Sequence, residues 1–104
     1  MASTKQQIRE KFRNAVFERD GYKCVFCTET ENLDAHHITD RHEMVRGGYV
    51  KENGITLCMT HHFMAEKFHI CKGLMWEGGF HPTELYKKIN SSYQIAYEKS
   101  QELE

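Results

Sequence analysis

The stretch of sequence that decides the fold runs from Leu33 to His62 and reads LDAHHITDRHEMVRGGYVKENGITLCMTHH. Five of the seven histidines of the chain lie inside it. Side chains of neighbouring residues on a β-strand point to opposite faces of the sheet. If the residues before Ile38 form a strand, the imidazoles of His36 and His37 face opposite ways, so one can bind a metal ion while the other faces a substrate.

Two pairs of potential metal ligands flank this stretch. Cys24-Val25-Phe26-Cys27 lies just upstream, and Cys58-Met59-Thr60-His61 closes it. Zn²⁺ takes four thiolate or imidazole ligands in a tetrahedral arrangement, and a two-residue gap lets one tight turn present two of them. The two pairs together predict a structural zinc site.

The order of these motifs resembles that of the HNH endonucleases, whose zinc-stapled core is of the ββα-metal, or His-Me finger, type. The resemblance lies in Cys24-x-x-Cys27, His36-His37-Ile38, Asn53 before a short apolar strand, and Cys58-x-x-His61-His62. It covers residues 17–69, about half of the 104 residues. It implies an α+β fold in which a ββα-metal core with a structural zinc is flanked by N-terminal and C-terminal helices.

The structural zinc is assigned to Cys24, Cys27, Cys58 and His61. Family members more often have a cysteine where His61 stands, so Cys71 is an alternative fourth ligand if the chain folds back after Cys58. Neighbouring residues in a helix diverge by about 100°, so His61 and His62 are poorly placed to serve one ion together. The two-residue gap from Cys58 favours His61, and an exchange of the two histidines stays open.

The resemblance also implies a catalytic site. His37 matches the general base of the family. His36 and His62 match the protein ligands of one catalytic divalent ion, and Asn53 matches a residue that orients the loop presenting the base. Many family members have an aspartate at the position of His36, and an imidazole there shifts the preference from Mg²⁺ toward Mn²⁺, Ni²⁺ or Zn²⁺.

Several other titratable residues lie close to these positions in the sequence. Glu66 follows His62 by one helical turn, and we expect its carboxylate to be solvated rather than bound to the metal. The remaining histidines lack partners at ligand spacing, so we expect each to lie at the surface or to be packed; they are His42, His69 and His81. Of these, His69 can reach the metal site from the end of its helix.

The formal net charge of −1 is unusual for a protein that binds DNA, because affinity for phosphates comes largely from lysine and arginine. Acidic residues collect at the C-terminal end, whereas basic residues cluster at the start of the chain and in the central loop. A locally basic face is therefore compatible with a nearly neutral protein. Arg41 is predicted to grip a phosphate of the substrate, and pairing with Asp40 or Glu43 is the alternative.

The N-terminal helix is predicted over residues 4–19, with Ser3 or Thr4 as its cap. Apolar residues recur every four positions and are expected to pack on the zinc core; they are Ile8, Phe12 and Val16. Charged residues on the other faces are expected to be solvated, and a phosphate-contacting arm is the alternative. These charged residues are Arg9, Lys11 and Arg13.

The rest of the chain predicts two strands and two further helical segments. The strands lie at 33–38 and 55–57, and the loop 39–52 between them is long enough to be functional. A helix over 61–69, capped by Thr60, follows. The C-terminal helical segment covers 82–100, with His81 as its cap, Pro82 in its first turn and an interruption at Ser91-Ser92. Four aromatic residues are expected in the core: Phe26, Phe63, Phe68 and Trp76.

The length predicts a single domain, residues 1–104, whose small core needs a staple such as zinc. Charged residues interrupt the first 20 positions, so no signal peptide is expected, and no apolar run reaches the length of a membrane span. Histidines interleave with the cysteines, which favours zinc-binding thiols over disulfides. We therefore expect an intracellular protein, in the cytoplasm of a bacterial or phage-infected cell.

These observations and the resemblance predict a metal-dependent DNA endonuclease that hydrolyses phosphodiester bonds with one divalent ion, Mg²⁺, Mn²⁺, Ni²⁺ or Zn²⁺, and a histidine base. The alternatives are a zinc-stabilised nucleic-acid-binding module and a nuclease subunit active only within a larger assembly, for example in phage packaging. No separate reading helix is evident, so weak sequence specificity is expected. The target sequence, nicking versus double-strand cutting, DNA versus RNA and the oligomeric state stay open.

Overall fold

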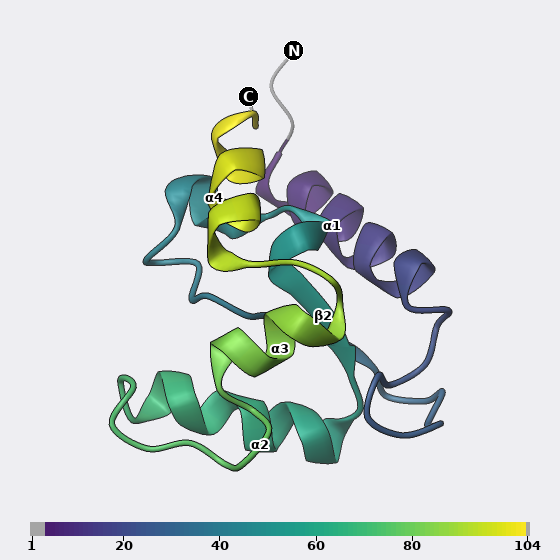
Figure 1. The fold of residues 1–104 in the computed structure, drawn as a ribbon. Helices are drawn as coiled ribbons and strands as arrows, with labels where there is room; N and C mark the ends of the chain where they lie inside the picture. Colours follow the sequence, from purple (N-terminus) through teal and green to yellow (C-terminus); the bar gives the residue numbers. More distant parts are fainter. Residues whose placement is uncertain (1–3, 104) are drawn as a thin grey trace.

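The computed structural model describes residues 4–103 as an α+β fold, as predicted (Figure 1). Four α-helices, two antiparallel strands and two short turns of 3-10 helix make up this described part of the chain. Their order is α1 (Lys5–Arg19), β1 (Asp34–His37), η1 (Val45–Gly48), η2 (Lys51–Asn53), β2 (Gly54–Leu57), α2 (Met59–Ile70), α3 (Pro82–Lys88) and α4 (Tyr93–Gln101). None of the described helices is long and apolar enough to cross a membrane.

Helix α1 begins and ends where the sequence predicts. The Thr4 hydroxyl accepts a hydrogen bond from the Gln7 amide at 3.1 Å, and the Gln7 side chain accepts one from the Thr4 amide at 2.9 Å. This reciprocal capping box satisfies two amides that the first turn leaves without partners. The helix ends at Arg19 with Asp20 as its C-cap, and Gly21 follows with a φ of +73° that glycine adopts without steric cost.

The end of α1 is fastened to β2 by side chains. Asp20 Oδ2 accepts a hydrogen bond from the Thr56 amide at 2.9 Å, and Arg19 Nη2 donates to the Gly54 carbonyl at 2.7 Å. Gly54 lets α1 approach closely, because a Cβ there would lie 2.4 Å from Val16 Cγ2. The helix therefore sits tightly against the strand that leads into α2.

The sheet lies between α1 and α2, and its register pairs His36 with Ile55 and His37 with Gly54. The alternation of side chains separates the two adjacent histidines. His36 is 2% exposed and turns toward α2, whereas His37 turns toward α1 and stacks on Phe12. This confirms the opposite orientation that the sequence predicts for the pair.

The C-terminal segment consists of two helices, because the chain is interrupted at the predicted serines. Ser92 Oγ caps α4 by accepting from the Ile95 amide at 3.1 Å, and Ser91 Oγ donates to the Glu52 carbonyl at 2.9 Å. His81 caps α3, as predicted, by accepting from the Thr83 amide at 3.1 Å. Ser91 thereby links the segment between α3 and α4 to the end of the central loop.

Two sequence-based expectations about α2 and its surroundings are wrong. The helix starts at Met59 with Cys58 as its cap residue rather than at the predicted Thr60 cap, because Cys58 already has the extended backbone of a residue that precedes a helix. Phe63 and Trp76 are 77% and 45% exposed, since their side of α2 and of the following loop is left uncovered in the described structure. By contrast, Phe26 packs against the core as expected.

Candidate metal centres and the adjoining cleft

The two sequence pairs predicted to hold zinc come together in space. The four ligand atoms of Cys24, Cys27, Cys58 and His61 all lie within 4.8 Å of one another. Cys27 Sγ is 3.8 Å from Cys58 Sγ, and His61 Nδ1 is 3.5 Å from Cys24 Sγ and 3.2 Å from Cys58 Sγ. Sulfur and nitrogen ligands of one tetrahedral zinc ion lie about 3.5–3.8 Å apart. The cluster can therefore hold a metal such as zinc.

The surroundings of this cluster act differently on its thiols. At Cys27 a backbone hydrogen bond of Glu29 acts to lower the pKa, but burial and the neighbouring sulfurs of Cys24 and Cys58 raise it overall, whereas Cys24 is favoured as a thiolate. Burial acts to raise the pKa of the Cys24 thiol, but backbone N–H groups of Cys58 and Phe26 act against it, and the pKa is lowered overall. The His61 ring stacks near Phe26 and Phe80, with ring centroids 5.5 and 6.0 Å away. These aromatic rings fix the orientation of the imidazole on one side of the cluster.

The fold assembles neither of the two alternative ligand sets for the structural zinc, in which Cys71 or His62 replaces His61. Cys71 follows α2 at the end opposite Cys58, a distance of about 18 Å along the helix axis, so it lies outside the cluster. His62 turns away from the cysteines and joins a different group of donors. The pairing of Cys58 with His61 through a two-residue gap is thus realised at the start of α2.

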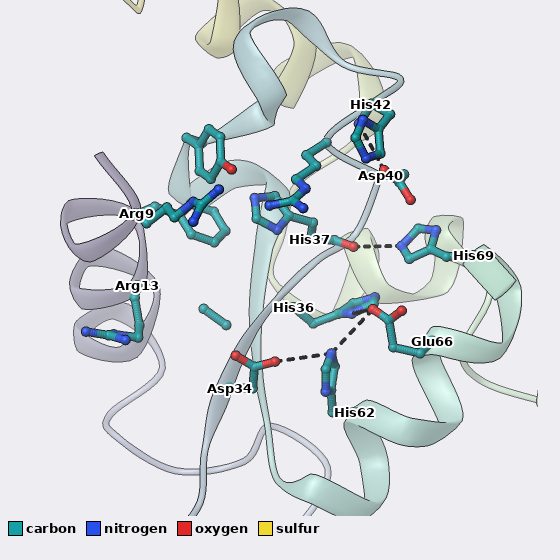
Figure 2. A pocket seen from close by; sticks show the side chains of 14 residues that line it. Arg9, Arg13, Asp34, His36, His37, Asp40, His42, His62, Glu66 and His69 are labelled. Carbon is teal, nitrogen blue, oxygen red and sulfur yellow. Dashed lines mark hydrogen bonds and ion pairs between the residues drawn. The ribbon is translucent and has the colours of Figure 1, made fainter. Parts of the chain in front are cut away.

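A second group of metal-ligand donors consists of His36 on β1 and of His62 and Glu66 on α2 (Figure 2). Glu66 Oε1 lies 3.2 Å from His36 Nδ1 and 3.3 Å from His62 Nε2. Asp34 Oδ2 lies 3.2 Å from the same nitrogen of His62. The expectation of a solvated Glu66 is therefore wrong, because β1 brings His36 against the face of α2 that carries both His62 and Glu66.

The donor set of this second group fits a divalent ion. Two ligands that each lie about 2.1 Å from one ion are about 3.0–3.4 Å apart, which matches the separations of Glu66 Oε1 from both histidines. Nδ1 of His36 is buried and has no well-directed hydrogen-bond partner in the described part of the chain. A buried nitrogen without a partner is costly, and a cation held by this nitrogen and the carboxylate would satisfy it.

The titratable residues of this second group shift one another's pKa values. The close contacts of Glu66 with His36 and His62 hold the pKa of the Glu66 carboxyl well below its usual range, so the group is an anion. Contact with Glu66 raises the pKa of His62 against the effect of burial, whereas burial lowers the pKa of His36. The buried imidazole is therefore neutral and retains a lone pair for a metal ion.

His37 lies beside this group but belongs to a different environment. Its ring stacks on Phe12 at 4.4 Å and meets the edge of Tyr49 at 5.0 Å. Burial, followed by the nearby His36 and Arg41, lowers the pKa of His37 to about 4. The imidazole is thus neutral at neutral pH, and its Nε2 atom has no hydrogen-bond partner among residues 4–103.

Asn53 is fully buried and uses its whole side-chain amide to hold the central loop. Its Oδ1 accepts from the Thr39 amide at 2.9 Å and from the Tyr86 hydroxyl at 2.7 Å. Its Nδ2 donates to the carbonyls of Thr39 and Gly48 at 3.0 and 3.2 Å. Because Thr39 follows His37 by two residues, these bonds fix the backbone just beyond the end of β1.

Two further residues support this arrangement; sequence reasoning missed Tyr86 and named His69 only as a histidine that can reach the metal site. Tyr86 reaches Asn53 from α3, and its burial raises the pKa of its hydroxyl to about 12, so it stays a hydrogen-bond donor. His69 Nε2 donates to the His37 carbonyl at 2.9 Å, and the His69 ring stacks 5.2 Å from that of His36. The spacing of His69, seven residues after His62, was a usable signal, whereas nothing in the local sequence points to Tyr86.

A cleft of about 520 Å³ joins these residues. His36, His37, His62 and Glu66 line it, together with Arg41, Tyr49 and two arginines of α1. Arg41 forms no ion pair with Asp40 or Glu43; Asp40 instead accepts a hydrogen bond from the His42 amide at 2.9 Å. Three arginines, a neutral imidazole and a group of metal-ligand donors thus face one opening.

The chain matches none of the family models, curated proteins or solved structures with which it was compared. The function of the cleft follows only from its donor atoms, its shape and the charges that surround it.

Proposed function

We propose that the protein is a metal-dependent endonuclease of the HNH type, with a ββα-metal core formed by β1, β2 and α2, which hydrolyses phosphodiester bonds in DNA. One observation carries the proposal. A neutral imidazole, that of His37, opens onto the same cleft as the donor group of His36, His62 and Glu66. A base next to a metal-ligand group is the combination that hydrolysis of a phosphodiester needs.

In this proposal, His37 accepts a proton from the attacking water. Its low pKa keeps the imidazole unprotonated at neutral pH, and the stack on Phe12 limits the rotation of the ring. Asn53 and Tyr86 act on the same step indirectly, because they hold the backbone that follows His37. They are positioning residues, since neither lines the cleft.

The ligands of the catalytic ion are His36, His62 and Glu66. A bound divalent ion supplies Lewis-acid stabilisation of the negative charge that builds on the phosphate and on the departing 3′ oxygen. Two imidazoles favour Mn²⁺, Ni²⁺ or Zn²⁺, while the carboxylate also accommodates Mg²⁺. All three ligands line the cleft together with Arg41, so a phosphate held by Arg41 could reach the ion.

A second candidate is a nuclease subunit that is active only within a larger assembly. The observation that favours it is the exposed apolar surface of α2 and the following loop, which includes Phe63, Ile70 and Leu74 at 77%, 71% and 85% exposure. Several large apolar side chains exposed on one helix and the loop after it are suited to contact with a partner. Cleavage that appears only after a partner is added would distinguish this candidate from the first.

The decisive experiment is cleavage of supercoiled plasmid by the zinc-loaded protein with Mg²⁺, Mn²⁺, Ni²⁺ and Zn²⁺ in parallel. We expect metal-dependent nicking or linearisation by the wild type and a loss of at least about 100-fold for His37→Ala, because the general base is removed. His81→Asn is the matched control, since it removes an imidazole outside the cleft and keeps a side chain suited to capping α3. Full activity of a folded His37→Ala protein would refute the proposed mechanism.

A further inference from the structure

We propose that α1 is a DNA-binding element, in which Arg9 and Arg13 hold the phosphate backbone next to the bond that is cut. This inference rests on the proposed function for the identity of the ligand, but it concerns binding rather than chemistry. The sequence alone favours solvated side chains at both positions, and the fold adds that both line the cleft.

The position of the two arginines is the first argument. They are four residues apart on α1, so their side chains leave the same face of the helix about 6 Å apart along its axis. Figure 2 shows both on the α1 side of the cleft, across the strands from the donor group of His36, His62 and Glu66. A chain of phosphates bound in the cleft can therefore contact both the arginines of α1 and the donor group.

The absence of ion-pair partners is the second argument. In the described structure, the ion pairs of arginine and lysine involve Arg19, Lys67 and Lys99, and none involves Arg9, Arg13 or Arg41. Arg19 shows the contrast, since it is committed to Asp20 and to the carbonyl of Gly54. Arg9 and Arg13 are exposed, and Arg9 contacts the hydroxyl of Tyr49 rather than a carboxylate, so both guanidinium groups can still donate to an anion.

The division of charge across the cleft is the third argument. Tyr49 contacts both Arg9 of the α1 wall and Arg41. Burial acts to raise the pKa of the Tyr49 hydroxyl, but the two arginines together outweigh it and lower the pKa. The carboxylates that line the cleft belong to Asp34, Asp40 and Glu66, and two of these contact His62. Positive charge is thus concentrated on the wall formed by α1 and the central loop, where a polyanion would be attracted.

Duplex DNA is the ligand that suits this wall. The two arginines sit at separate heights on the helix, so they can contact different phosphates rather than one isolated anion. Contacts of this kind read no base, which agrees with the weak sequence specificity expected of the chain. A net charge of −1 does not oppose binding, because the positive charges are gathered on one wall.

The test measures binding in the absence of cleavage. The zinc-loaded full chain, without added divalent ions, is titrated with a fluorescent DNA duplex between 50 and 200 mM salt. We expect Arg9→Gln/Arg13→Gln to lose about eightfold in affinity per lost phosphate contact at 0.1 M salt, and the slope of log affinity against log salt to become shallower by about 0.9 per contact. Arg9→Lys/Arg13→Lys should keep most of the slope, because the charge is retained.

The matched control is Lys11→Gln/Lys23→Gln, which removes the same charge from exposed positions outside the cleft and should bind DNA almost like the wild type. Equal losses in both double variants would overturn the proposal, because they would show only an effect of net charge. Unchanged binding by the α1 variant would overturn it as well. Tighter binding of an RNA duplex, with the same loss in the α1 variant, would refute DNA as the ligand.

The outcome separates this inference from the proposed function. If α1 variants lose DNA affinity while the wild type cleaves no plasmid with any metal, DNA binding by α1 is supported and the proposed nuclease activity is refuted. If plasmid cleavage depends on His37 but the α1 variants bind and cut like the wild type, the nuclease activity is supported and DNA binding by α1 is refuted.

Discussion

The two groups of metal-ligand donors share one helix and differ in how much space they leave. In the first group, Cys58 and His61 meet the earlier pair of cysteines, and the four ligands come from two separate segments of the chain. In the second group, His62 and Glu66 meet His36, Asp34 lies close to His62, and the group lines the cleft. The first group offers four ligand atoms that all lie within 4.8 Å of one another, whereas the second offers three.

The number of protein ligands suits the first group to stabilising the fold and the second group to holding an ion that a substrate can reach. A zinc ion with four protein ligands has no position for a substrate, so it serves to join the segments that carry the ligands. A site with three protein ligands leaves coordination positions for water and phosphate oxygens. Because His61 and His62 are neighbours on α2, the ion in the first group would also fix the direction in which the second group points.

The largest effect is expected when the first group loses a ligand. Cys58→Ser should unfold the protein at room temperature, because the binding free energy of a structural zinc, about 10–16 kcal/mol in small zinc domains, exceeds or equals the whole stability of most small proteins. Far-UV circular dichroism and zinc content measure the loss. Cys71→Ser is the matched control and should keep both, so a folded Cys58→Ser protein would show that the first group is dispensable.

Removal of Glu66 should affect only the second group. Glu66→Gln is expected to weaken Mn²⁺ binding to the zinc-loaded protein by about 100-fold or more, because the anionic ligand next to both histidines becomes neutral and loss of a group behind a ligand already costs about 10–100-fold. Isothermal titration calorimetry measures the affinity, and Glu18→Gln on the exposed side of α1 is the control. Loss of the structural zinc in Glu66→Gln would contradict the separation between the two groups.

Tyr86 tests whether the central loop depends on a contact outside both groups. Tyr86→Phe should lower the free energy of unfolding by about 1.5 kcal/mol, because Asn53 Oδ1 loses a buried donor and the Thr39 hydroxyl loses its partner. Thermal unfolding should shift by about 8 °C. The described structure gives Tyr97 no comparable hydroxyl hydrogen bond, so Tyr97→Phe should leave the transition nearly unchanged; an equal shift would remove the role assigned to Tyr86.

The smallest effect is expected at His69, which contacts both neighbouring histidines of β1. His69→Phe keeps an aromatic ring against His36 but loses the donor to the His37 carbonyl, whereas His69→Gln keeps a donor and loses the ring. We expect plasmid cleavage by His69→Phe to be about fivefold slower, because the loss of one hydrogen bond worth about 1 kcal/mol lowers a rate by that factor. Cleavage by His69→Gln should return toward the wild-type rate. Mn²⁺ affinity, measured alongside, should fall only where the ring is lost. The opposite order of the two variants would show that stacking, rather than the hydrogen bond, positions the base.

The parts of the site that follow from the sequence are those fixed by short spacings. Two-residue gaps present Cys24 with Cys27 and Cys58 with His61, and the alternation of a strand separates His36 from His37; local geometry decides all three cases. The α+β class and the capped ends of α1 and α3 were predictable for the same reason. Each depends on residues no more than a few positions apart.

The contacts that sequence analysis missed join distant elements. Glu66 has the spacing of a ligand, but an ordinary solvated carboxylate on a helix has the same spacing, and only the packing of β1 against α2 distinguishes them. Tyr86 lies 33 positions from Asn53, and the arginines of α1 reach the cleft because Gly54 admits the helix close to β2. The exposed Phe63 is the converse case, since its apolar character predicts burial that no described element supplies.

The saturation of the Asn53 amide has a consequence for the lifetime of the protein. An asparagine followed by glycine loses ammonia readily, because the amide nitrogen of the glycine can attack the asparagine side chain. In the folded chain this reaction is suppressed, since all polar atoms of the Asn53 side chain are hydrogen-bonded and the Gly54 amide donates to the Lys51 carbonyl. Once unfolded, the pair is free to react, and the resulting carboxylate can no longer donate to Thr39 and Gly48. Each unfolding episode thus exposes the molecule to irreversible chemical ageing at the residue that holds its central loop.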